Sequence, residues 1–281
     1  MSRIDHYENF PVASWLCPAR LRPAVAALYH FARTADDLAD EGFDPAHHRL
    51  DALGEYRADL QQCLSRSGTA YVPSVRWPHV FTPLRQVVEQ HQLPQAPLFD
   101  LLDAFEQDVV YTSVGQGYRN RAELLDYCRR SAEPIGRLLL HLYGVDDPAA
   151  LARSDDICTA LQLINFWQDL SVDIPRGRFY LPDDNCAAHG VDRSQLQALQ
   201  PTPRTTALIT EHARWARATM LEGAPLVHRL PGRIGWELRL VVQGGLRILD
   251  KVDALHGHSL CQRPRIRAWD APVMLGRALV M

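Results

Sequence analysis

An acidic stripe on an otherwise apolar helix constrains this chain more than any other feature of its sequence. Between positions 25 and 39, the residues outside a small polar set are almost all alanine, leucine, valine or phenylalanine, without glycine or proline. This pattern predicts one long helix that is apolar around most of its circumference, as interior helices are. Its polar residues at offsets of 0, 4, 7 and 11 share one face: Tyr29, Arg33, Asp36 and Asp40.

Asp37 lies at the edge of this stripe. Carboxylates this close together on an apolar wall repel one another and lose their charge unless a cation lies between them. Arg33 can compensate one carboxylate, and it is also placed to pair with Asp37 one turn later. The remaining negative charge predicts a bound metal ion.

A second helix repeats the same design. The stretch Ile157–Leu170 is apolar on most sides, and its polar residues fall at offsets of 0, 3, 7 and 11: Gln162, Asn165, Asp169 and Asp173. Two such helices are expected to form two walls of one cleft. Solvated charged faces are the alternative, but neither helix has the separate apolar face of a surface helix.

The donor atoms of the two stripes indicate which metal is expected. Oxygen ligands without cysteine or histidine favour magnesium, which commonly bridges protein carboxylates to substrate phosphates. The predicted ligands are Asp36, Asp37, Asp40, Asn165, Asp169 and Asp173.

Composition excludes several classes of protein. The 281 residues carry a net charge of −3, which gives no electrostatic basis for binding nucleic acid. The six cysteines are far apart and never form a C-x-x-C pair, so we expect reduced thiols, a cytoplasmic location and neither zinc nor disulfides. The N-terminus has no apolar signal core, and no stretch approaches 18 consecutive apolar residues, so no membrane span is expected.

The remaining pattern is helical throughout. Helices are expected at about 45–66, 81–92, 97–111, 121–131, 134–144, 203–222 and 232–255, with a loop at about 174–190 and a basic tail from Arg263. No linker or repeat divides the chain, so residues 1–281 are predicted to form one all-α domain. Asp103, Glu106 and Asp108 do not form a single stripe and are interpreted as a solvated face.

The motifs resemble those of a known family. Asp36-Asp-Leu-Ala-Asp40 and Asn165-Phe-Trp-Gln-Asp169-Leu-Ser-Val-Asp173 are similar to the two acidic motifs of the squalene and phytoene synthase family. Tyr29-x3-Arg33, Gln162 and Tyr127-Cys-x2-Ser-Ala-x-Pro-Ile-Gly136 also match, and the likeness runs from about residue 7 to 255. Asn9-Phe-Pro-Val-Ala-Ser14 and the second acidic motif look most like the bacterial hydroxysqualene synthases of the hopanoid pathway.

The resemblance implies an isoprenoid synthase helical bundle with a central cavity and magnesium-dependent chemistry on farnesyl-derived diphosphates. In the hydroxysqualene branch, presqualene diphosphate ionises, its cyclopropane rearranges, and water captures the cation. The implied catalytic residues are Asp36, Asp40, Asp169 and Asp173. The implied substrate-binding residues are Asn9, Tyr29, Arg33, Tyr127, Gln162 and Arg178. On residue type alone, the two tyrosines are core residues, and Arg176 and Arg178 could compensate a helix C-terminus.

Two departures from the phytoene-type pattern stand out. Gln168 occupies a position where those members carry arginine, and Gly244-Gly245 lies near where they carry tyrosine. Fewer positive charges and a roomier cavity wall are the expected consequences, and both disfavour plain phytoene synthesis.

Other functions remain open from the sequence. Head-to-head condensation of two farnesyl diphosphates, to presqualene diphosphate or squalene, is the main alternative, with phytoene synthesis beside it. A non-enzymatic assembly-factor relative is disfavoured because both acidic motifs are intact. No nicotinamide cofactor is expected. The lipophilic substrate and product favour reversible contact with a bilayer surface, and neighbouring enzymes of the squalene pathway are candidate partners.

Overall fold

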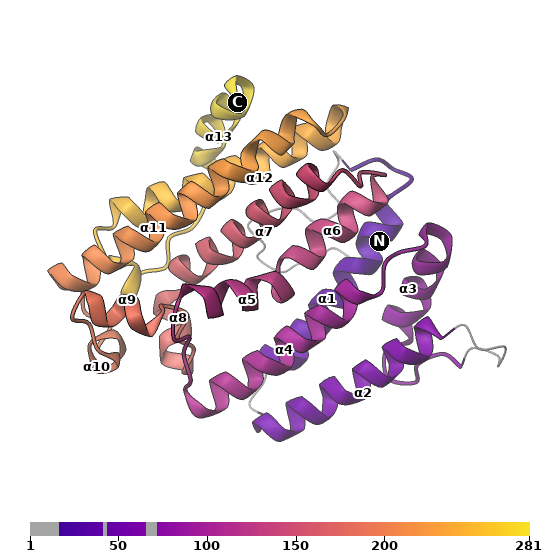
Figure 1. Ribbon diagram of the computed structural model, residues 1–281, viewed down its shortest axis with the longest axis horizontal. Helices are drawn as coiled ribbons and strands as arrows, with labels where there is room; N and C mark the ends of the chain where they lie inside the picture. The colour runs from indigo at the N-terminus through magenta and orange to yellow at the C-terminus, as the bar shows by residue number, and fades with distance from the viewer. Residues whose placement is uncertain (1–16, 42–43, 66–71) are drawn as a thin grey trace.

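The structure, a computed structural model, describes residues 17–41, 44–65 and 72–281. The predicted substrate residue Asn9 lies outside the described residues. The first seven helices, shown in Figure 1, are α1 (Arg22–Asp40), α2 (Ala46–Leu64), α3 (Pro78–His91), α4 (Ala96–Val114), α5 (Arg121–Ser131), α6 (Glu133–Leu142) and α7 (Pro148–Gln168). They are followed by α8 (Leu170–Asp173), α9 (Asp183–Ala188), α10 (Arg193–Gln197), α11 (Pro203–Gly223), α12 (Gly232–Ala254) and α13 (Ala271–Val280).

The predicted all-α class is confirmed. No strand occurs in the described part of the chain, and one parallel bridge joins Gly117 to Phe179. Among the described helices, none is long and apolar enough to cross a membrane. All six cysteines are unpaired, as expected, and four of them are buried.

Local chemistry explains where many helices begin. A proline occupies the first turn of α1, α3, α4, α6, α7 and α11, where a missing N–H costs nothing. Asn120 caps α5 by accepting a hydrogen bond from the Glu123 N–H (3.0 Å), and Asp147 caps α7 in the same way. Gly115 ends α4 with φ +62°, a conformation that glycine adopts without strain.

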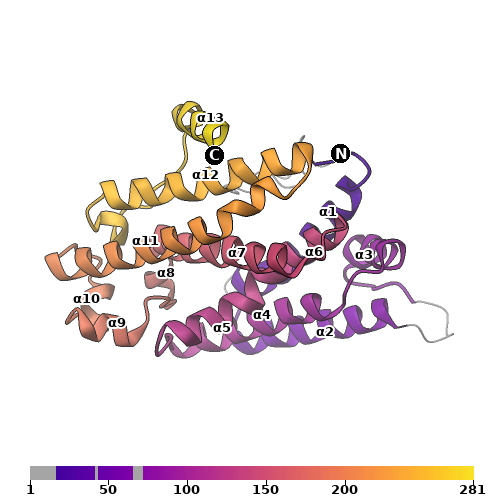
Figure 2. The same cartoon turned by 45° about the horizontal axis from the view of Figure 1, so that its top comes forward.

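The buried apolar residues form two clusters. One gathers side chains from α1, α2, α3, α4 and α6, around Phe31, Tyr56 and Phe81. The other gathers side chains from α5, α7, α11 and α12, around Trp167. In Figure 2, α11 and α12 lie above α7, whereas α2, α4 and α5 lie below it. The functional cavity described below lies between the two clusters.

Three local predictions were wrong. The helix expected from about residue 81 begins earlier, at Pro78. Packing of Val80, Phe81, Leu84 and Val87 outweighs the hydrogen bond lost at Pro83 inside it. The second acidic helix does not run unbroken through Asp173. It ends at Gln168, and Asp169, at φ −102° and ψ 12°, separates it from α8. The expected loop at 174–190 contains a 3-10 helix, Ile174–Arg176, and the short helix α9.

A histidine in the second cluster gives a pH-dependent prediction. His212 is fully buried, with its Nδ1–H bonded to the Leu208 carbonyl (2.8 Å) and its ring against Trp167. Burial lowers its pKa from the ordinary 6.5 to about 4, so between these values the unfolded chain binds more protons than the folded one. The contribution of His212 to stability should therefore fall from pH 6.5 toward pH 4, with an upper limit of ~3 kcal/mol.

Urea unfolding across this pH range measures the effect. His212→Gln should remove this contribution, so its free energy of unfolding, relative to that of the unaltered chain, should rise as the pH falls. His47→Gln, which changes an exposed histidine, should follow the unaltered chain. Equal slopes for all three proteins would contradict the assignment.

Candidate active site

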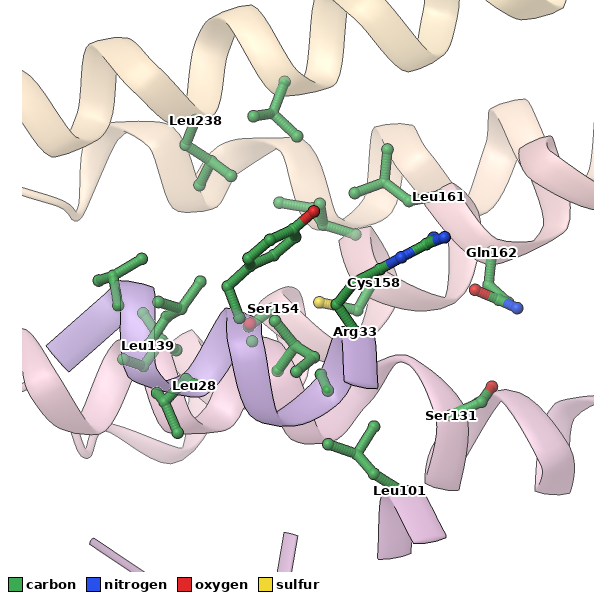
Figure 3. A pocket seen from close by; sticks show the side chains of 18 of the residues that line it. Leu28, Arg33, Leu101, Ser131, Leu139, Ser154, Cys158, Leu161, Gln162 and Leu238 are labelled. Carbon is green, nitrogen blue, oxygen red and sulfur yellow. The ribbon is translucent and has the colours of Figure 1, made fainter. Parts of the chain in front are cut away.

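A cavity of about 530 Å³ lies between the two apolar clusters. Its wall is formed mainly by leucine, isoleucine and valine side chains from α1, α4, α6, α7 and α12, including Leu28, Leu101, Leu139, Leu161 and Leu238. Figure 3 shows that Arg33 extends toward Gln162 at one end, whereas Leu28, Leu139 and Leu238 gather at the other. The cavity therefore has one polar end and a long apolar remainder, a shape suited to an amphiphilic ligand.

The stripe predicted on the first acidic helix is present. Tyr29, Arg33, Asp36 and Asp40 all line the cavity from α1. Asp37 does not line it. Arg33 contacts both neighbouring carboxylates, with Nη1 to Asp36 Oδ2 at 3.1 Å and Nη2 to Asp37 Oδ1 at 2.6 Å. Both interpretations of Arg33 therefore hold, since it pairs with Asp37 and also faces the cavity.

Arg178 joins the two acidic motifs. Its guanidinium forms two parallel hydrogen bonds to the carboxylate of Asp40, at 2.9 and 2.6 Å, and lies 3.8 Å from Asp173. The side chain is only 9% exposed, so these contacts lie in a partly desolvated region where charge interactions are strong. Gly177, at φ +82°, makes the turn that directs Arg178 back toward α1. Arg176, by contrast, is exposed.

The basic tail reaches the second acidic motif. Arg263 holds Asp169 through both carboxylate oxygens, with Nη2 to Oδ2 at 2.8 Å. Gln168, fully buried, donates from Nε2 to the carbonyl of Pro264 (2.8 Å), the residue that follows Arg263. Gln168 therefore points to the tail and is absent from the cavity wall, so our expectation that it changes the charge of the cavity was wrong.

Asp108 was assigned wrongly to a solvated face. It is 7% exposed, lines the cavity and accepts a hydrogen bond from the Tyr180 hydroxyl (2.9 Å). Asp103 and Glu106 do lie toward solvent, where both pair with Arg57. A signal for Asp108 was available, because Leu101, Phe105 and Asp108 fall at offsets of 0, 4 and 7 on one helical face.

An aromatic wall adjoins the carboxylates. Phe166 and Tyr180 stack with ring centroids 3.9 Å apart, and Tyr127 lies 6.2 Å from each of them. Tyr127 is buried, as expected of a core tyrosine, and it also lines the cavity. Electron-rich ring faces of this kind stabilise positive charge that develops nearby.

Three carboxylates of this end have raised pKa values. Burial and the Asp40 carboxylate raise the pKa of Asp36 to about 7, against the opposing effect of Arg33. Burial and Asp169 raise the pKa of Asp173 to about 7, and burial and Asp40 raise that of Asp108 to about 6. Although 36% of the Asp36 side chain is accessible, that residue lines the cavity, where neighbouring carboxylates act on its pKa. The arginines present therefore do not fully compensate the acidic groups.

The remaining predicted residues are placed as follows. Gln162 lines the cavity from α7. Asn165 is exposed, and neither it nor Asp169 nor Asp173 lines the cavity. Asp173 is linked through Arg178 to Asp40, which does line it, whereas Asp169 is paired with Arg263. Across the residues that the structure describes, no three His, Cys, Asp or Glu side chains are arranged to hold one metal ion.

The glycine pair at 244 and 245 does not widen the cavity. A Cβ on Gly245 would lie 3.0 Å from Met220 Cε and 3.1 Å from Ile164 Cδ1, in the contact between α12, α11 and α7. The expected roomier wall was wrong at this position, because the small residue permits close helix packing.

The contact between Gln168 and Pro264 gives a second prediction. Gln168→Leu should leave the Pro264 carbonyl without its partner, lower stability by about 1–3 kcal/mol, and free the segment that places Arg263 on Asp169. Amide hydrogen exchange at residues 265–267 should accelerate. Gln61→Leu, which makes the same change at an exposed site on α2, should alter neither. Unchanged exchange in Gln168→Leu would show that the tail is held by other contacts.

The chain matches a known family over nearly all of its length. The model of the family described as squalene/phytoene synthase matches residues 5–270 of the chain. The chain belongs to the squalene/phytoene synthase family. As the motif resemblance implied, the chain is an isoprenoid synthase of the prenyltransferase-like type with a single helical domain.

Relatives of this chain carry more than one name. A hydroxysqualene synthase of Sinorhizobium fredii is 32% identical over 246 residues, which cover 87% of this chain and 78% of that protein. A phytoene synthase of Thermus thermophilus is 30% identical over 278 residues, covering 98% and 89%. In structure, the squalene synthase HpnC from Alicyclobacillus acidocaldarius superposes with a TM-score of 0.77 at 32% identity, covering 89% of this chain and 90% of that one.

Proposed function

We propose that the protein converts presqualene diphosphate and water to hydroxysqualene and pyrophosphate, in the squalene route of hopanoid biosynthesis. The observation that carries this proposal is the cavity itself, with carboxylates and Arg33 at one end, Arg178 paired with one of those carboxylates, and mostly apolar side chains along the rest. The similarity to hydroxysqualene synthases supports the choice of reaction.

The polar end suits a diphosphate bound with magnesium. Magnesium commonly binds through one or two carboxylates together with substrate phosphates and water, so a preformed three-carboxylate cage is not required. The raised pKa values of Asp36 and Asp173 indicate uncompensated negative charge that a divalent cation would neutralise. The residues that would hold it are Asp36, Asp37, Asp40, Asn165, Asp169 and Asp173. The ion would neutralise charge that develops on the leaving diphosphate.

The chain's own residues perform the other tasks. Arg33 and Arg178 present guanidinium groups that can donate to phosphate oxygens as the carbon–oxygen bond breaks and its electron pair leaves with the diphosphate. Tyr29 and Gln162 also line the cavity and are proposed to contact the substrate. Tyr127 and Tyr180, which line the cavity, stabilise the carbocation, with Phe166 stacked against Tyr180, and the leucine-rich remainder holds its hydrocarbon and restricts water.

One product analysis distinguishes the candidate reactions. The protein is incubated with presqualene diphosphate and magnesium, without a nicotinamide reductant, and separately with farnesyl diphosphate. Hydroxysqualene from the first mixture supports the proposal. No turnover of presqualene diphosphate would overturn it, and products formed from farnesyl diphosphate alone would favour condensation, which the phytoene synthase relatives also suggest.

The setting of the enzyme follows from this chemistry. We propose that it acts in the cytoplasm, in reversible contact with a bilayer into which the lipophilic product passes, and beside other enzymes of the squalene pathway. No nicotinamide cofactor enters the proposed reaction, because water rather than hydride ends it.

A further inference from the structure

The C-terminal helix α13 has the reverse of the usual surface pattern. Ala278 is its only buried residue, and its one charged residue is Arg277. Leucine and valine side chains project outward along it, with Leu279 69% and Val280 87% exposed. A helix of this composition normally packs its apolar side against something.

Polar contacts hold α13 in place. Just before the helix begins, the buried Asp270 pairs with Arg247 (2.8 Å) and Lys251 (2.7 Å) of α12. At the other end, Arg239 of α12 donates to the carbonyls of Ala278 (3.0 Å) and Met281 (2.6 Å). Figure 2 shows α13 standing outside α12, on the face away from α7. The apolar side chains are thus presented to the exterior by a firmly attached helix.

Two exposed tryptophans flank this helix, and each carries an arginine. Arg267 lies over the ring of Trp269 and Arg239 over that of Trp236, both 4.9 Å from the ring centroid. Trp269 and Trp236 are 64% and 42% exposed. Tryptophan and arginine side chains combine an apolar body with a polar or charged end, which suits the headgroup level of a bilayer.

The charge of this region differs in sign from that of the whole chain. Residues 262–281 contain four arginines and one aspartate, in a chain whose net charge is −3. The one aspartate, Asp270, is buried and already paired, whereas Arg265 and Arg267 are exposed. A basic and apolar surface of this kind complements an anionic lipid layer.

We propose that α13, with Trp269 and Trp236, lies in the interface of an anionic lipid bilayer. The helix has ten residues and is about 15 Å long, half of a hydrocarbon core of about 30 Å, so it would lie along the surface. The exposed arginines Arg265 and Arg267 beside it would repel their equivalents in a second copy but attract anionic lipid, which favours the bilayer. On its other side, α12 contributes Ile234, Leu238 and Val241 to the cavity wall, so one helix separates the bilayer from the cavity.

Vesicle sedimentation of the full chain tests the proposal. The unaltered protein should bind vesicles of phosphatidylcholine mixed with phosphatidylglycerol more strongly than vesicles of phosphatidylcholine alone, and added salt should reduce this preference. Leu279→Asp should lower the partition coefficient at least about tenfold. The matched control is Val114→Asp at the end of α4, an equally exposed apolar residue at 69%, which should bind as the unaltered protein does.

A second variant keeps the test independent of folding. The double change Arg265→Ser with Arg267→Ser alters exposed side chains only and should remove most of the preference for anionic vesicles. Absence of vesicle binding by the unaltered protein, or equal binding by Leu279→Asp, would overturn the proposal. So would a dimer in solution that Leu279→Asp dissociates, because a second copy would then cover α13. The proposal needs only this surface, so pyrophosphate release measured without vesicles tests the proposed reaction separately.

Discussion

Asp40→Asn should lower kcat/KM for pyrophosphate release from presqualene diphosphate by about 10²–10³-fold. Asp40 is the residue at which α1, Arg178 and the second acidic motif meet, through two hydrogen bonds to the Arg178 guanidinium. The amide of asparagine cannot supply the negative charge that balances Arg178 or attracts a divalent cation. Asparagine has nearly the shape of aspartate, so the cavity itself should be preserved.

The control for this change lies on α4. Asp103→Asn makes the same replacement in an exposed carboxylate that also pairs with an arginine, Arg57, at 2.6 Å. It should leave kcat/KM within about twofold, since isolated surface ion pairs contribute little. Pyrophosphate release by Asp40→Asn at the rate of this control would exclude the polar end of the cavity as the ionisation site.

Gly223→Ala should destabilise the protein by about 2–3 kcal/mol. The added Cβ would lie 2.6 Å from the Arg153 carbonyl oxygen, 2.7 Å from Ile157 Cγ1 and 2.9 Å from the Ile157 nitrogen. Two of these three atoms belong to the backbone of α7 and cannot rotate away. The end of α11 must therefore separate from α7, which carries Gln162 and leads into the second acidic motif.

Gly54→Ala is the matched control and should change stability in the opposite direction. Gly54 lies within the exposed face of α2, and an added Cβ meets nothing within 4 Å. Alanine in a helix interior is favoured over glycine by about 1 kcal/mol, so this variant should be more stable than the unaltered chain. Urea unfolding of both variants gives the two signs. A neutral Gly223→Ala would mean that α7 and α11 pack less closely than described.

The periodicity of the sequence predicted the part of the site that lies on regular helices. Offsets of 3, 4, 7 and 11 depend only on helical geometry, so Tyr29, Arg33, Asp36 and Asp40 could be assigned to one face from their spacing alone. The same reasoning was wrong at Asp173, because it assumed an unbroken helix. Hydrophobic spacing does not show that Asp169 departs from helical geometry.

Residues that reach the site by tertiary packing could not be predicted in this way. Asp108 was missed because it shares α4 with acidic residues that do face solvent. Only its helical spacing from Leu101 and Phe105 indicated that it lies on the side of the helix that lines the cavity. Tyr180 and Arg263 lie after turns, where no repeating pattern relates a side chain to a direction. Likewise, the docking of α13 by Arg239 and Asp270 depends on contacts between segments that are distant in the sequence.

The cavity between the two apolar clusters links the stability of the folded protein to the concentration of the proposed substrate. A hydrocarbon chain held there touches leucines of both clusters at once, Leu28 and Leu101 on one side and Leu140 and Leu226 on the other. Each methylene it buries contributes about 0.8 kcal/mol, as a leucine methylene would. Because such a ligand binds only the folded chain, a higher ligand concentration raises the melting temperature of the protein. At a low isoprenoid concentration, the protein would therefore unfold at a lower temperature.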